Sequence, residues 1–399
     1  RRLADGLAVA SVVMATLVAS PPTHSEGPES PVERGFAADG VYQTGDVDSI
    51  DLMTGGLSLK IPIGLRYPAG GGMSYGLTLR YTSQVWDKEI SDADPETGEK
   101  YQQAFPIELS NAGMGFVLSM GELVFEEAEG EENYWYYVTG DGGRHRFFDT
   151  LHNEDQDPAA FGFEHLYTRD GSYLRLKYDP DNDVQRVVQH PDGTEHTFVY
   201  EQATDEWRLS SIDDQFGNGV QITGNTSGST QWHLHDTQGR DHYVNLEGMT
   251  CDGATVYFVT SVELETFDGA TSTYQFEYQS TGIDRSGYDD DPSTCGDPDD
   301  PDDADVIVPL LVQVILPNGE DYRMGEFDSG SRSWIPWYAT NATGMMDDLP
   351  GVLEMLKLPS GGAIQWDYAS RDLFHRADEA ACTPTLDDPC KNTLHLDWV

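Results

Sequence analysis

Residues 51–87 of this 399-residue chain read DLMTGGLSLKIPIGLRYPAGGGMSYGLTLRYTSQVWD and decide its fold. Apolar and polar residues alternate over 57–63 and again over 77–83, which is the period of a β-strand with one buried face. The apolar positions are Leu57, Leu59, Ile61, Ile63, Leu77, Leu79 and Tyr81, whereas Ser58 and Lys60 occupy the opposite face. The Pro- and Gly-rich connection around 69–72 predicts a hairpin with a long loop.

The same pattern of strand, glycine-containing turn and return strand recurs along the rest of the chain. Strands are expected at 115–118, 121–126, 134–139 and 144–148, and the later turns contain Asp-Gly, Asn-Gly or Ser-Gly. Such dipeptides predict hairpins with two-residue turns, each of which packs against the next. Because no segment keeps a 3.6-residue period, we expect an all-β fold of consecutive antiparallel β-hairpins. These would form a continuous curved sheet or hollow shell with little helix.

Composition divides the chain into four parts. Residues 1–20, with Arg1 and Arg2 before an apolar run at 7–19, have the form of a secretory signal peptide truncated at its start. Residues 21–45 are rich in Pro, Gly and acidic residues, which predicts a flexible linker. We expect the first β-sheet segment over 46–160 and degenerate hairpin repeats over 161–399, with a solvated acidic insertion at 289–305. Both ends of the chain are expected to be cut from a longer protein.

The charge of the chain excludes two classes of partner. It carries 70 Asp and Glu against 23 Lys and Arg, a formal net charge of −47. Nucleic acid and anionic membranes would be repelled, so neither is expected as a partner. The apolar run near the start is too short to cross a bilayer, and no membrane span is expected in the mature chain.

The four cysteines, Cys251, Cys295, Cys382 and Cys390, fit an exported chain in which they form disulfides. Local spacing favours the pairs Cys251–Cys295 and Cys382–Cys390. A zinc site is the alternative, although no C-x-x-C spacing is present.

Two acidic segments are candidates for loose calcium binding. Asp179, Asp181 and Asp183 form the D-x-D-x-D opening of a calcium loop, but a valine follows where an EF-hand needs glycine, and the twelfth position lacks glutamate. Asp297 and Asp299 offer further oxygen ligands within the acidic insertion. A hydrated loop without metal is the alternative for both segments, and no other cofactor is expected.

Histidines suggest two further metal candidates. His233 and His235 are two residues apart, so on a strand they share one face and could hold a metal with a third ligand such as His242. His190 and His196 are a second pair. A polar outer face without metal is the alternative interpretation.

Nothing in the sequence selects an enzyme. No G-x-S-x-G motif occurs, and the numerous carboxylates do not single out a catalytic pair. We therefore expect no catalytic or cofactor-binding residue. Aromatic groups such as Trp334 and Trp337 could stack on sugar rings, but core packing is the favoured explanation, because aromatics are ordinary strand residues.

The stretch 51–87 resembles the opening module of secreted bacterial RHS/YD-repeat proteins. That module combines D-x-x-T-G-x-L-S-L-x-I-P-I/L-G with G-G-x-S-Y-x-L-x-L-x-Y-x-S and V-W-D. The matching residues are Asp51, Thr54, Gly55, Leu57, Ser58, Leu59, Ile61, Pro62, Gly64, Gly71, Gly72, Ser74, Tyr75, Leu77, Leu79, Tyr81, Ser83, Val85, Trp86 and Asp87. The later turns are similar to YD repeats; 236–240 (DTQGR) comes nearest, although a full Y-D-x-x-G-R is absent. The resemblance covers roughly 41–399.

This resemblance implies a scaffold role. In the family, repeats spiral into a hollow shell around a carboxy-terminal segment, often a toxin, and related proteins act at the cell surface. We accordingly expect a non-catalytic secreted scaffold of the polymorphic-toxin kind, whose cargo is its own carboxy-terminal segment, not included here. We likewise expect the self-cleaving core of the family to lie outside this chain. The alternative is a cell-surface adhesin or carbohydrate-binding β-repeat protein, with a receptor or glycan as partner.

Overall fold

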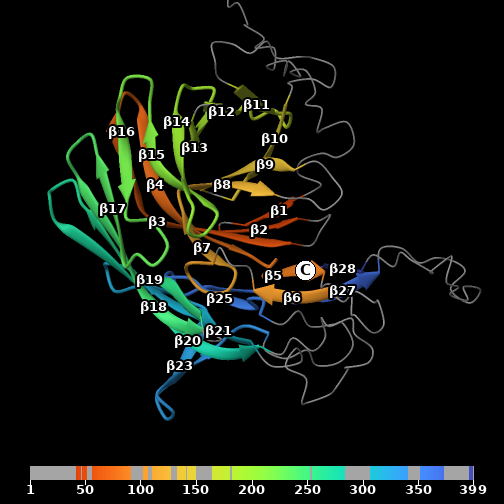
Figure 1. Ribbon diagram of the computed structural model, residues 1–399. Coiled ribbons are helices and arrows are strands. Elements are labelled where there is room, and N and C mark those ends of the chain that lie inside the picture. The colour runs from red at the N-terminus through yellow and green to blue at the C-terminus, as the bar shows by residue number, and fades with distance from the viewer. Residues whose placement is uncertain are drawn as a thin grey trace, which may run out of the picture.

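The computed structural model describes thirteen segments of the chain: 42–45, 47–51, 56–90, 102–106, 110–126, 133–140, 142–149, 164–179, 182–251, 254–283, 306–339, 351–372 and 395–398. Within these segments the chain forms only strands, turns and connecting loops, so the expected all-β fold is confirmed (Figure 1). The described residues include no helix long and apolar enough to span a bilayer.

Residues 57–82 form the centre of a five-stranded antiparallel sheet. Its order is β1-β2-β3-β4-β7. The strands are β1 (Tyr42–Thr44), β2 (Asp48–Asp51), β3 (Leu57–Gly70), β4 (Met73–Thr82) and β7 (Phe116–Ser119). Strand β1 falls at the end of the segment expected to be a linker. We call β3 and β4 the opening hairpin.

The predicted faces of the opening hairpin are confirmed, but its predicted long loop is wrong. Leu59 and Ile61 are fully buried, and Lys60 between them is exposed. Strand β3 continues to Gly70, so only a tight turn at 71–72 separates it from β4. Its register with β4 shifts between Ile63 and Tyr67 and again between Pro68 and Gly70. Such bulges accommodate a proline inside a strand, and this is why the Pro- and Gly-rich segment extends the hairpin instead of ending it.

A ring of strands follows the opening sheet. The strands are β8 (Gly121–Glu126), β9 (Tyr134–Thr139), β10 (Arg144–Phe148), β11 (Glu164–Thr168), β12 (Arg175–Asp179), β13 (Asn182–Gln189), β14 (Glu195–Glu201) and β15 (Glu206–Asp213). Each pairs with the next in sequence, and the start of β15 returns to β8 through Trp207 and Leu123. These eight strands therefore close on themselves.

A long curved sheet continues from the same β15. Its strands are β16 (Gly219–Thr223), β17 (Gln231–Asp236), β18 (Asp241–Cys251), β19 (Ala254–Glu265), β20 (Thr271–Ile283), β21 (Val306–Ile315), β22 (Asp321–Arg323), β25 (Met355–Lys357) and β26 (Ala363–Gln365). One edge of β15 has two partners: the start of the strand pairs with β8, and the end of the strand pairs with β16. Strand β15 is therefore the fork between the ring and the curved sheet.

Three two-stranded pairs complete the described part of the chain. Strands β5 (Trp86–Ile90) and β6 (Gln102–Pro106) form one pair, β23 (Gly325–Asp328) and β24 (Ser333–Pro336) a second, and β27 (Ala369–Asp372) and β28 (His395–Trp398) a third. The second pair lies between β22 and β25 in sequence. Strand β22 nevertheless pairs directly with β25, so the curved sheet resumes after this excursion.

Seven of the predicted hairpin turns share one geometry, which differs from the predicted two-residue turn. In each, the first residue donates its backbone N–H to the carbonyl of the residue four positions later, and its own carbonyl accepts a hydrogen bond from the glycine three positions later. These turns begin at Thr139, His190, Asp214, Asp236, Thr266, Leu316 and Leu358. The loops thus contain three residues, the geometry of a type I turn followed by a left-handed residue. That residue is always glycine, with φ between 80° and 94°.

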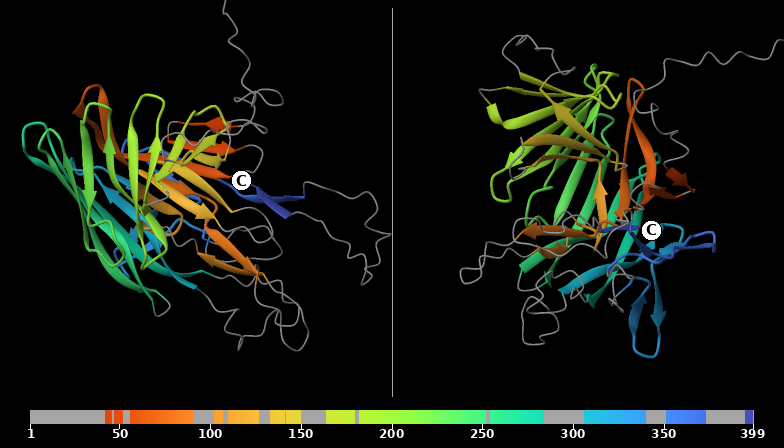
Figure 2. Two further views of the ribbon diagram at one scale, coloured as in Figure 1. Left: turned by 45° about the horizontal axis from the view of Figure 1, so that its top comes forward. Right: turned by 90° about the vertical axis from the view of Figure 1, so that its right-hand side faces the viewer.

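The opening hairpin packs against the inner face of the curved sheet. Alternation along β17–β19 places Leu234, Val244 and Val262 on that face, where they are buried in the same core as Leu59 and Ile61. Figure 2 shows the hairpin, in orange, lying along the green and teal strands. One continuous core therefore joins residues that are about 200 positions apart in sequence.

Candidate functional site

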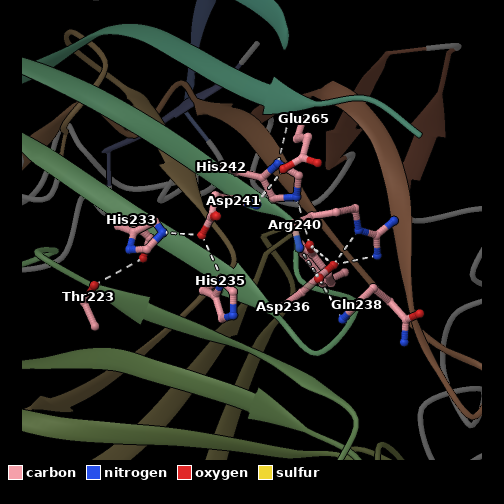
Figure 3. Close-up of polar contacts among 10 residues, drawn as sticks. Thr223, His233, His235, Asp236, Gln238, Arg240, Asp241, His242 and Glu265 are labelled. Atoms are coloured by element: carbon pink, nitrogen blue, oxygen red, sulfur yellow. Dashed lines mark hydrogen bonds and ion pairs between the residues drawn. The ribbon is translucent and has the colours of Figure 1, made fainter. Parts of the chain in front are cut away.

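Polar side chains gather on both faces of the β17–β18 hairpin (Figure 3). Because side chains alternate along a strand, His233 and His235 lie on the outer face, and Asp236 and His242 lie on the inner one. The turn between the strands is the DTQGR segment at 236–240, the nearest match to a YD repeat. The two faces therefore offer two separate polar clusters.

The inner cluster is built around a buried carboxylate. The Asp236 side chain is 0% exposed, and its Oδ1 accepts hydrogen bonds from the backbone N–H groups of Gln238 (2.9 Å) and Arg240 (3.0 Å). Its Oδ2 accepts from Arg240 Nε at 2.7 Å and from the Tyr75 hydroxyl at 2.7 Å. Burial by itself raises the pKa of Asp236, but the bonds from Tyr75 and Arg240 outweigh it and hold the pKa below its usual value.

The same cluster fastens the opening hairpin to the curved sheet. The backbone N–H of Glu265 donates to His242 Nδ1 at 3.0 Å, so the neutral imidazole carries its proton on Nε2 and donates to the Tyr75 oxygen at 2.9 Å. Burial lowers the pKa of His242 and favours this neutral form. Arg240 Nη2 donates to the Pro68 carbonyl at 2.6 Å. We call Tyr75, Asp236, Arg240 and His242 the clamp.

Two more turn residues support the clamp. Thr237 Oγ1 and Gln238 Nε2 both donate to the Ala69 carbonyl, at 3.0 and 2.8 Å. The sequence singled out 236–240 only by its D-x-x-G-R letters and assigned it no contact, and the role of Tyr75 was missed. The only sequence signal was that both segments belong to the family resemblance. The clamp neutralises the buried Asp236 carboxylate between the two sheets and supplies its hydrogen bonds.

The outer cluster joins three potential metal ligands. Asp241 Oδ1 lies 2.7 Å from His233 Nε2 and 2.8 Å from His235 Nδ1, and the ligand atoms of all three residues lie within 4.8 Å of one another. The hydrogen bonds from the two imidazoles lower the pKa of Asp241. The shared face of His233 and His235 is as predicted. The suggested third ligand is wrong, because His242 faces inward and belongs to the clamp.

The second histidine pair is brought together by the hairpin of β13 and β14: His190 follows β13, and His196 lies in β14. The imidazoles of His190 and His196 lie 4.6 Å apart between centroids, and His196 Nδ1 lies 2.9 Å from the Tyr137 hydroxyl. His190 Nε2 is buried and has no hydrogen-bond partner among the described residues. Burial, reinforced by His190, lowers the pKa of His196 to about 3, and burial also lowers that of His190. Both rings are therefore neutral at pH 7.

We expect this pair to make the fold acid-sensitive. An unfolded histidine titrates near pH 6.5, whereas folded His196 does so near pH 3, so the unfolded state binds the extra proton between these values. The free energy of unfolding therefore keeps its full value above pH 6.5 and falls by up to about 1.4 kcal/mol per pH unit below it. His190 and His145 oppose the added charge, and Asp192 favours it.

Melting temperatures measured from pH 7 to pH 4 check this expectation. The His196→Gln variant, which removes the titrating group, should lose less stability on acidification than the unsubstituted protein. His235→Gln, at an imidazole that is 53% exposed, should follow the unsubstituted protein. Superimposable pH profiles for His196→Gln and the unsubstituted protein would contradict the assignment.

The structure places the remaining candidate residues without testing their roles. Asp179 is the last residue of β12 and Asp183 lies in β13, but their side chains and all of Asp181 lie outside the described part. Asp297, Asp299, Cys295, Cys382 and Cys390 also lie outside it, and Cys251 is described only as the last residue of β18. The calcium sites and the disulfide pairs remain predictions.

A cavity of about 670 Å³ lies at the fork between the ring and the curved sheet. Its lining includes the aromatic groups of Trp207, Trp232 and Tyr257 and the hydroxyls of Ser227 and Ser229. Aromatic faces beside hydroxyl groups suit a ligand with both apolar and polar surfaces. The aromatic group noted in the sequence is elsewhere: Trp334 lies on β24, where its indole N–H donates to Glu277.

Comparison with known proteins finds no matching family model and no matching curated protein. Among solved structures, the chain is similar to the crystal structure of TcdB2-TccC3-Cdc42, with 12% identity and a TM-score of 0.38 over 69% of this chain and 16% of that one. For the crystal structure of TcdB2-TccC3-TEV the values are 13% and 0.31, over 85% and 17%.

A third similar structure is the N-terminal domain of effector protein SpvB from Salmonella typhimurium strain LT2. The identity is 12% and the TM-score 0.28, over 77% of this chain and 99% of that one. The chain thus spans about a sixth of the length of the first two structures. At these identities and TM-scores, the likenesses establish neither a family nor a function.

Proposed function

We propose that this chain is a non-catalytic secreted scaffold, a wall of β-hairpins that encloses or presents a carboxy-terminal segment outside this chain, with a toxin as one such cargo. The observation that carries the proposal is the way the wall is built. Strands from β8 to β22 are added one after another, and six of the connections between them use one repeated turn. The clamp fixes the opening hairpin to the inner face of the curved sheet.

This construction suits a wall better than a catalytic cleft. In a sheet built from consecutive hairpins, each unit contacts mainly its neighbours, so the sheet is extended by adding units. Among the described residues, β26 pairs with β25 alone, which leaves an edge where a further hairpin can pair. The most deeply buried polar groups, those of the clamp, are engaged in holding two sheets together, and the proposal assigns them no catalytic or cofactor-binding role.

The remaining parts of the proposal concern location and partners. An exported protein at the cell surface or in the medium fits a surface that carries a net charge of −47, which keeps such a wall soluble and away from nucleic acid. The principal partner in this proposal is the chain's own carboxy-terminal continuation. Bound calcium, if any, would be loose and in the acidic segments.

Limited proteolysis tests the proposal. The chain should be expressed together with the segment that follows it in its gene, and the same segment should be expressed alone as the control. We expect trypsin, under native conditions, to cleave the downstream segment at least tenfold more slowly when it is attached to the wall. Equal cleavage rates would contradict enclosure.

The cavity at the fork favours a second candidate, a surface protein that binds a glycan. Trp207 and Trp232 offer faces on which a sugar ring can stack, and Ser227 and Ser229 offer hydroxyl groups for hydrogen bonds. Such a protein has no need to shelter a downstream segment. Rapid cleavage of that segment would therefore favour this candidate over the scaffold.

A further inference from the structure

We propose that His233, His235 and Asp241 form a binding site for a divalent transition-metal ion with the preferences of Zn²⁺. The three residues come from neighbouring strands, and the pairing of His235 with Asp241 in register sets them side by side. His233 lies two residues before His235 on the same face, so all three side chains converge on one point (Figure 3). This inference is independent of the proposed scaffold role.

The present distances are close to those that a metal ion requires. Zinc is bound at about 2.0–2.2 Å by imidazole nitrogen and carboxylate oxygen, so neighbouring ligand atoms in a tetrahedral site lie about 3.3 Å apart. The two nitrogens now lie 2.7 and 2.8 Å from Asp241 Oδ1, held by hydrogen bonds. Each nitrogen needs to move about half an ångström away from Oδ1, and the two nitrogens, which lie within 4.8 Å of each other, need to reach the same spacing of about 3.3 Å. Side chains that are 39–53% exposed can make these changes by rotation.

The nitrogens already point at the required position. In the neutral imidazoles, His233 Nε2 and His235 Nδ1 carry the protons that bond to Asp241. On metal binding each ring keeps one proton, which moves through solvent to its other nitrogen, and the freed lone pair binds the ion. The carboxylate then contributes an oxygen ligand and one negative charge.

Surrounding groups hold two of the three ligands in place. The Tyr243 ring stacks on His233, with centroids 5.0 Å apart and an angle of 11° between the rings. Glu265 Oε2 accepts the backbone N–H of Asp241 at 3.0 Å, which fixes the start of β18. Outer contacts of this kind orient ligands and strengthen metal sites.

The ligand set defines the class of ion. Two imidazole nitrogens and one carboxylate favour Zn²⁺, Cu²⁺ and Ni²⁺, whereas Ca²⁺ and Mg²⁺ prefer oxygen ligands alone. Three protein ligands leave one position for water or for a group from another molecule. The strongly negative chain also raises the local concentration of cations.

Calorimetric titration of the full chain with Zn²⁺, after treatment with EDTA and gel filtration, tests the site. We expect the protein to bind Zn²⁺, and both His233→Gln and His235→Gln to weaken one site at least tenfold. Both positions are exposed enough for the variants to fold, which circular dichroism would verify. Co²⁺ should give visible absorption bands in the unsubstituted protein, and these should be lost in both variants.

His145→Gln is the matched control. His145 Nδ1 pairs with Asp170 Oδ2 at 2.7 Å, so it also belongs to a histidine–aspartate pair, but with a single imidazole. Its substitution should leave zinc binding unchanged, and Ca²⁺ should not compete at the site. Two results would overturn the proposal. One is that His233→Gln and His235→Gln both keep the Zn²⁺ affinity and stoichiometry of the unsubstituted protein. The other is that the unsubstituted protein does not bind Zn²⁺ at a concentration of about 1 mM, which is on the order of the weakest specific affinities.

Discussion

The Leu59→Asp variant is expected not to fold, and Ile61→Asp should behave in the same way. Both side chains are 0% exposed and lie in the core shared by the opening hairpin and the curved sheet. An unpaired carboxylate in such a position costs several kcal/mol, in addition to the packing that is lost. That sum is comparable with the whole free energy of unfolding of a domain, about 5–15 kcal/mol.

Lys60→Asp is the matched control, because it introduces the same residue one position along the strand. Lys60 is exposed and lies opposite Arg80 in the β3–β4 register, so a carboxylate there remains solvated beside a guanidinium. We expect a change of at most about 1 kcal/mol in the free energy of unfolding. Soluble expression and circular dichroism compare the three variants. Equal tolerance of all three would mean that the hairpin is peripheral to the fold.

Replacement of Arg240 by Met should destabilise the protein by about 3–5 kcal/mol, because it removes one partner of a buried ion pair. The Asp236 carboxylate would stay 0% exposed after losing its bonds from Arg240 Nε and Nη2, and the Pro68 carbonyl would lose its donor. The methionine fills much of the space of the guanidinium stem, so lost charge pairing dominates. Chemical denaturation monitored by tryptophan fluorescence measures the change.

Two comparisons separate the clamp from ordinary surface pairing. Arg323→Met removes an arginine that is 41% exposed and bonded to Asp321, and it should cost at most about 1 kcal/mol. In Asp236→Asn/Arg240→Met the buried charge is gone, while an amide oxygen can still accept the turn N–H groups. This double variant should be more stable than Arg240→Met alone. If Arg240→Met destabilised the protein no more than Arg323→Met does, the clamp would not hold the two sheets together.

The sequence alone determined the local features of this protein. Alternation over 57–63 fixed which side chains of β3 are buried, because the period of a strand is two whatever the strand packs against. Asp-Gly and Asn-Gly located the hairpin turns, because glycine alone adopts positive φ at little cost. The turn length escaped prediction, because the same dipeptides serve both two-residue turns and the three-residue turns that the chain uses.

Only the tertiary structure decided which of these elements meet. Tyr75 and Asp236 are 161 residues apart, and no local pattern encodes that the opening hairpin crosses the DTQGR turn. Strand β15 pairs with both β8 and β16 along one edge, and the alternation of its own residues does not specify these two partners. Asp241, not His242, joins His233 and His235, because the register of β17 with β18 and the alternation of faces turn His242 inward. Periodicity and turn chemistry act over a few residues, whereas these contacts depend on how whole sheets pack.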